Sequence, residues 1–129
     1  MTDESLPAWY QDALKSFVNK EGVLPPPWIF SENAHPSSLQ WRMGAGETYM
    51  MVFFEWWANF PTEAQRIAYF QKWPPPPRWY AWMSDFIWDL KPWEAGGEFN
   101  YQPYFDRLKN LGFPDGDRYQ ADLDDEQWR

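Results

Sequence analysis

The sequence contains no cysteine and only one histidine, His35. Without cysteine, the chain cannot form disulfides, thiolate zinc sites or cysteine nucleophiles. A single histidine excludes histidine-rich metal sites and the paired Glu-x-x-His arrangement of di-iron bundles. His35 precedes Pro36 in a polar stretch, and we interpret it as a solvated side chain rather than a catalytic one. We therefore expect neither a metal ion nor a cofactor.

The chain also lacks a long uninterrupted apolar run. A membrane span needs roughly 18 uncharged apolar residues, and residues 46–60 come closest but contain Glu47 and Glu55. Residues 1–5 lack the positive region and apolar run of a secretory signal. From these absences we expect a soluble cytoplasmic protein that does not act at a membrane.

Positive charge is scarce relative to negative charge. The 129 residues fit one domain and carry a formal charge of −8. Residues 115–129 hold six acidic residues and two arginines, so half of the net charge lies at the end of the chain. A net negative chain repels nucleic acid. We expect no direct nucleic-acid binding, and an acidic mimic of nucleic acid remains a weaker alternative.

Aromatic residues, in contrast, are unusually frequent. The chain has 11 tryptophans, 10 phenylalanines and 7 tyrosines, together 22% of its residues. Each aromatic side chain buries about 150–250 Å² when it is packed in a core. Because a core of this size cannot hide all of them, some aromatic side chains should reach the surface and take part in an interface.

The spacing of apolar residues predicts an all-α fold, because alternation over a strand length is nowhere convincing. We predict a compact orthogonal or irregular bundle of five to six short helices, joined by proline-rich loops. It forms a single domain over residues 1–114, followed by an acidic tail over residues 115–129 that is either flexible or folded back through Trp128. The predicted helices cover residues 7–20, 39–43, 47–59, 62–73, 78–90 and 100–111.

Capping residues and prolines set the expected ends of these helices. Ser5 is expected to cap the first helix, and Thr62 with Gln65 has the spacing of a capping box. The segment Gly44-Ala45-Gly46 is interpreted as a linker. Residues 23–30 are expected to be extended, with Trp28, Ile29 and Phe30 packed on the body. We interpret Pro74–Pro77 as a rigid joint between helices rather than a docking ligand.

The most apolar stretch of the chain is residues 46–60, which contain no proline before Pro61. We predict a central helix here, since a helix that is apolar over most of its circumference is normally buried. The predicted helices at 7–20, 62–73 and 78–90 are expected to bury their apolar sides against it. The only stripe of this helix with polar content consists of Thr48, Met51, Glu55 and Asn59.

Two acidic residues of this helix are the strongest candidates for catalytic or ligand-binding residues. Glu47 and Glu55 are about 12 Å apart along the axis, too far for a catalytic carboxylate pair on their own. With Asp85 and Arg42 they could form a small-molecule or hydrolytic pocket, because an acid among aromatics has a raised pKa. The interpretation we favour is that both glutamates are exposed or pair with an arginine. We therefore assign no catalytic residue.

The leading hypothesis is a small interaction protein without catalysis, which binds a protein partner or a second copy of itself. Tryptophan, tyrosine and arginine are enriched at the hot spots of protein interfaces. Trp57, Trp88, Trp93 and Trp128 lie off the main helical stripes, so we expect them to be exposed. The predicted binding residues are Trp57, Arg78, Tyr80, Trp88, Trp93 and Trp128.

Overall fold

The computed structural model describes residues 7–128, which form helices and connecting segments but no strand. The predicted all-α fold class is confirmed. The chain forms two compact units, the first ending at Asn59 and the second beginning at Phe60. Two compact units need not be two domains, so the single domain over residues 1–114 stays a prediction.

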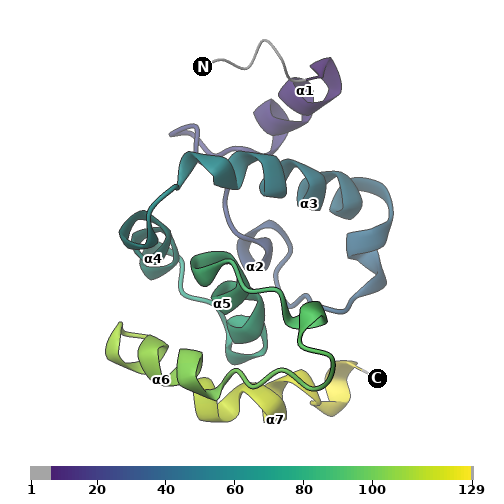
Figure 1. Ribbon diagram of the computed structural model, residues 1–129. Coiled ribbons are helices and arrows are strands. Elements are labelled where there is room, and N and C mark those ends of the chain that lie inside the picture. The colour runs from purple at the N-terminus through teal and green to yellow at the C-terminus, as the bar shows by residue number, and fades with distance from the viewer. Residues whose placement is uncertain (1–6, 129) are drawn as a thin grey trace. The chain divides into compact units, whose positions relative to one another are not determined.

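In the first unit, α3 has the central place, because both α1 and the turn η2 pack on it (Figure 1). The helices of this unit are α1 (Ala8–Phe17), α2 (Pro27–Phe30) and α3 (Gly44–Trp56). Its 3-10 turns are η2 (Leu39–Arg42) and η3 (Trp57–Asn59).

The core of this unit is built around the ring of Tyr49, which is fully buried. The ring stacks on Phe30 with 4.3 Å between centroids, and the rings of Trp41 and Phe17 lie 5.9 and 5.8 Å away. The Tyr49 hydroxyl donates a hydrogen bond to the carbonyl of Pro25. Burial of so large a side chain contributes a few kcal/mol to stability, and the hydrogen bond satisfies its polar end.

The proline-rich segment before α3 differs from its prediction in two ways. Pro27–Phe30 forms a helical turn with Pro27 at its first position, where the missing N–H costs nothing. Trp28 is buried as expected, but Ile29 is 46% exposed. A single helical turn points successive side chains in different directions, so Trp28 and Ile29 cannot both face the core.

The first helix is shorter than predicted. Pro7 is the N-cap of α1 and makes no side-chain cap, while the predicted capping residue Ser5 lies outside the described residues. The helix ends at Phe17 because Asn19 organises a turn after it. The Asn19 side-chain oxygen accepts hydrogen bonds from the backbone N–H groups of Glu21 and Val23 at 2.9 and 3.0 Å. Such local bonds compete with helix continuation.

The predicted linker Gly44-Ala45-Gly46 is instead the first turn of α3. Gly44 has a φ of +59°, a left-handed conformation that favours glycine. A Cβ at Gly46 would lie 2.0 Å from the carbonyl oxygen of Gln40. Glycine at this position therefore allows η2 to pack directly on the helix, an effect that helix propensity alone does not reveal.

In the second unit, α5 contacts both α4 and α6. The helices are α4 (Glu63–Lys72), α5 (Tyr80–Trp88), α6 (Gln102–Asn110) and α7 (Tyr119–Leu123). The 3-10 turns are η4 (Pro77–Trp79), η5 (Pro92–Glu94), η6 (Gly116–Arg118) and η7 (Glu126–Trp128).

The capping box predicted at the start of α4 is confirmed. The Thr62 hydroxyl accepts the Gln65 backbone N–H at 3.2 Å, and the Gln65 side-chain oxygen accepts the Thr62 backbone N–H at 3.1 Å. Two backbone donors that the helix itself leaves unsatisfied are thus paired reciprocally. The stripe of α4 that includes Ile67 and Phe70 is buried, as the spacing predicted.

Removal of the Thr62 cap is expected to lower the free energy of unfolding. The Thr62→Ala variant should lose about 1 kcal/mol of unfolding free energy, because the first turn of α4 loses its hydroxyl acceptor. Urea denaturation followed by circular dichroism measures this loss. The Thr62→Ser variant keeps the hydroxyl and should stay close to the wild type, and an equal loss in both variants would contradict the cap's contribution.

Helix α5 ends earlier than the position of Pro92 suggests. Asp89 adopts a left-handed conformation with φ of 52° and closes the helix as its C-cap. Asp85 and Asp89 therefore do not share a helical face, although they are four residues apart. Asp89 lies outside the helix, where its side chain is 80% exposed and 3.7 Å from the Lys91 ammonium.

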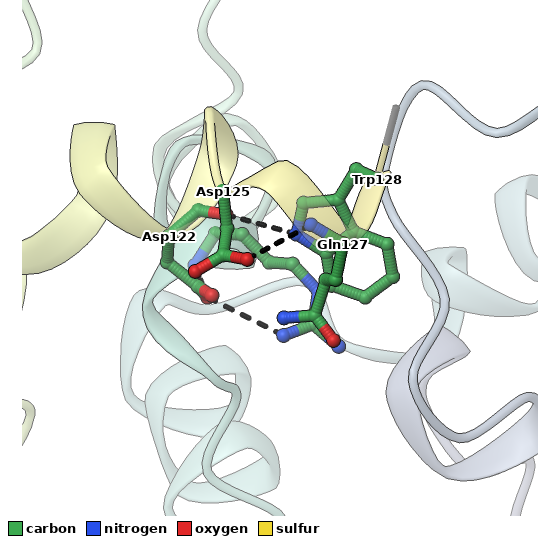
Figure 2. Close-up of polar contacts among 5 residues, drawn as sticks. Asp122, Asp125, Gln127 and Trp128 are labelled. Carbon is green, nitrogen blue, oxygen red and sulfur yellow. Dashed lines mark hydrogen bonds and ion pairs between the residues drawn. The ribbon is translucent and has the colours of Figure 1, made fainter.

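The acidic tail is helical in part and packs on η4. Asp122 of α7 accepts hydrogen bonds from the Arg78 backbone N–H at 2.9 Å and from its guanidinium at 3.3 Å. Trp128 covers that guanidinium at 4.5 Å from the ring centroid. Its indole N–H donates a hydrogen bond to the Asp122 carbonyl (Figure 2). A buried arginine thus receives its compensating charge from the tail.

Candidate functional site

Three of the predicted binding residues are buried, which corrects our expectation of an exposed tryptophan surface at these positions. Trp57 is only 7% exposed, because the chain turns into η3 and stacks its ring on Phe53 at 5.4 Å. Tyr80 is 2% exposed, and its hydroxyl accepts the Asp115 backbone N–H. Arg78 is buried against Asp122, as described above.

The remaining tryptophans of the predicted set have different surroundings. Trp88 is half-buried between Tyr104, 5.4 Å away, and the Arg107 guanidinium, 5.0 Å from the ring centroid. Its indole N–H is buried without a hydrogen-bond partner among residues 7–128. Trp128 is half-buried over Arg78, whereas Trp93 on η5 is 74% exposed. Of the predicted set, Trp93 is therefore the side chain most available to a partner.

The alternative hypothesis, a small-molecule or hydrolytic pocket, needs acidic side chains that are buried among aromatic residues. Glu47 and Glu55 are both exposed on α3, as is Arg42 at the end of η2. Neither glutamate forms an ion pair within the described part of the chain, so of the two alternatives predicted for them the structure shows exposure rather than pairing with an arginine. Arg66 instead donates to the carbonyls of Phe60 and Ile87. Exposure removes the apolar surroundings that a general acid on α3 needs.

Asp85, in contrast, has an unusual environment within the second unit. It is partly buried, and its carboxylate accepts the Tyr101 hydroxyl at 2.9 Å. Burial raises the pKa of Asp85 to about 6, although the hydrogen bond from Tyr101 lowers it. Burial and the Asp85 charge also raise the pKa values of Tyr101 and Tyr119. Both tyrosines therefore stay neutral at physiological pH and leave Asp85 as the titrating group of this cluster.

This pKa predicts how the stability of the second unit depends on pH. Because the folded-state pKa exceeds the ordinary value of 3.8, folding favours the protonated carboxyl. The stabilisation is complete below pH 3.8 and is lost as the pH rises through about 6. The Asp85→Asn variant should gain stability relative to wild type over this interval. Urea midpoints of both proteins from pH 4 to 7 measure the difference.

The control for this titration is Asp89→Asn, which neutralises an exposed carboxylate close to α5. Its pH profile should follow that of the wild type. A constant difference between wild type and Asp85→Asn at every pH would contradict the raised pKa.

A small open cavity of about 130 Å³ lies between α6 and η6. Its polar lining includes Lys109, Asp117 and Asp106, and the Asp106 carboxylate accepts the Gln102 side-chain amide at 2.9 Å. None of the residues predicted to bind or to catalyse lines this cavity. No group of three or more potential metal-ligating side chains occurs in the described residues. The cavity has room for water or a small ion but offers no catalytic constellation.

Several exposed apolar side chains lie on α3 or directly before it, whereas Trp9, Ile29, Leu39 and Trp93 are exposed on other elements. Phe54 is 65% exposed, Met51 is 49% exposed, and Met43, the N-cap of the helix, is 55% exposed. One broad face of α3 carries Glu47, Met51, Phe54 and Glu55, and Met43 directly precedes the helix. We call this surface the α3 outer face, and it consists of Met43, Glu47, Met51, Phe54 and Glu55.

A signal for this face was present in the sequence. The single stripe of α3 with polar content, which includes Met51 and Glu55, marks the side that is directed toward solvent. Phe54 lies next to that stripe, but its apolar character gives no sign of its exposure. Periodicity alone cannot decide how wide the buried side of such a helix is.

No helix within residues 7–128 is long and apolar enough to cross a membrane. The chain matches no protein-family model, no curated protein and no solved structure. The surfaces described above are therefore the basis for inferring its function.

Proposed function

We propose that this protein binds a partner protein through the α3 outer face and has no catalytic activity. The observation that carries the proposal is the exposure of Met51 and Phe54, at 49% and 65%, on a helix whose opposite side forms the core. Methionine and aromatic residues are enriched at protein interfaces, and neighbouring exposed apolar side chains mark such sites. Two other exposed aromatic side chains lie elsewhere, Trp9 on α1 and Trp93 on a turn in the other unit.

The packing of α3 supports this use of its outer face. Tyr49, Val52 and Phe53 are fully buried and hold the helix in place from the inner side. A partner would therefore meet a helix that is already ordered, so binding would not have to offset the cost of folding it. Partly solvated Met51 and Phe54 side chains would lose their remaining exposure on binding, which is the main favourable contribution.

The experiment is a quantitative co-purification from the native cell with three forms of the full chain. The Met51→Ser/Phe54→Ser variant changes two exposed residues and should retain the wild-type melting temperature. We expect it to lose a co-purifying protein that the wild type retains. The Trp93→Ser variant is the matched control, since it removes an exposed aromatic outside the α3 outer face. Equal recovery with all three forms would contradict the proposal.

A further inference from the structure

The α3 outer face is acidic as well as apolar, and this combination restricts what can bind it. Glu47 and Glu55 are its two charged members, and both are exposed. They are separated by two turns of helix, or about 12 Å, with Met51 midway between them. The first 59 residues hold seven acidic and three basic residues, so the surrounding unit is also net negative. A complementary surface therefore needs apolar groups flanked by positive charge.

From this geometry, and on the basis of the proposed function, we infer that the partner contributes a basic amphipathic helix that packs along α3. The outer face extends from Met43 to Glu55, a length of about 18 Å. A partner helix of three to four turns matches this length and presents apolar residues at i, i+3, i+4 and i+7. Lysine or arginine residues eight positions apart on that helix would reach both glutamates.

A second copy of this chain does not fit the same surface. An antiparallel pairing of two α3 helices centred on Met51 places Glu47 of each copy opposite Glu55 of the other. A parallel pairing places each glutamate beside its own counterpart. Like charges at such positions are destabilising, in contrast to opposite charges at the same spacing. The charge pattern thus favours a different, basic protein over self-association.

The test is selection of a displayed library of helical 18-residue peptides on the immobilised full chain. Peptides are kept if they bind the wild type but not the Met51→Ser/Phe54→Ser variant. We expect these face-dependent peptides to carry net positive charge beside an apolar stripe. Their affinity should fall about tenfold toward the charge-reversed variant Glu47→Lys/Glu55→Lys, because two attractive pairs become repulsive. Selection on that variant should yield acidic peptides instead.

Other outcomes of the selection would contradict either the inferred basic helix alone or the proposed function as well. If face-dependent peptides show no excess of basic residues, or bind the charge-reversed variant equally well, the inference fails while the proposed function stands. If no peptide depends on Met51 and Phe54, the proposed function fails as well. Sedimentation of the wild type and of the Met51→Ser/Phe54→Ser variant tests self-association. If the wild type is a dimer and the variant is a monomer, the α3 outer face binds a second copy of the chain, and the inference of a basic partner fails.

Discussion

The Gly46→Ala variant should lose about 3 kcal/mol or more of the stability of the first unit. An added Cβ would lie 2.0 Å from the backbone oxygen of Gln40 and 2.8 Å from its carbonyl carbon. Overpacking typically costs 1–3 kcal/mol when side chains can adjust, and here the obstacle is backbone, which adjusts less easily. Either η2 must move away from α3 or the start of the helix must unwind. Either change would disturb Trp41, which contacts Tyr49.

Urea denaturation measures this loss, and the near-ultraviolet circular dichroism of the aromatic core reports it separately. The matched control is Gly97→Ala, because a Cβ at Gly97 would meet nothing within 4 Å. That variant should change stability by less than about 0.5 kcal/mol. A Gly46→Ala protein as stable as the Gly97→Ala protein would contradict the close packing of η2 on α3.

The second large effect is expected for Asp122→Ala, which should destabilise the second unit by about 2–3 kcal/mol. Removal of one partner leaves a buried charge uncompensated, a change that costs about 3–5 kcal/mol when both partners are fully buried. The loss should be smaller here because the Asp122 side chain is 20% exposed, against 9% for Arg78. The Arg78 backbone N–H also loses its acceptor.

Equilibrium denaturation gives the total loss, and amide exchange at Arg78 reports the local part. The Asp122→Asn variant keeps an oxygen acceptor without the charge, so its loss should be intermediate. The control is Asp124→Ala, which removes an exposed carboxylate that accepts the Gln120 side-chain amide at 2.7 Å. Equal stability of the Asp122→Ala and Asp124→Ala variants would contradict the claim that the Asp122 carboxylate compensates the buried charge of Arg78.

Much of the helical pattern could be predicted from the sequence because its signals are local. Thr62 and Gln65 define a capping box by their spacing alone, and the stripe of α4 follows from helical periodicity. The beginning of α3 could not be predicted in this way. Gly44 and Gly46 suggest a linker when they are considered locally, and only the approach of Gln40 explains why glycine begins this helix.

The candidate site was harder to predict, because exposure depends on which elements pack together. Phe54 and Phe53 are adjacent and chemically identical, yet one is 65% exposed and the other fully buried. Trp57 was expected at the surface because it lies off the main stripe, but the change from α3 to η3 turns it onto Phe53. The burial of Arg78 depends on Asp122, a residue 44 positions later that no local pattern connects to it.

Methyl spectroscopy of methionine can show whether the α3 outer face is the binding surface. The full chain, labelled with ¹³C at its methionine methyl groups, is titrated with the protein that co-purifies with it. We expect the signals of Met51 and Met43 to shift or broaden, while that of Met83, which is fully buried in the second unit, stays unchanged. Binding that leaves the Met51 and Met43 signals unchanged would contradict the proposed binding surface.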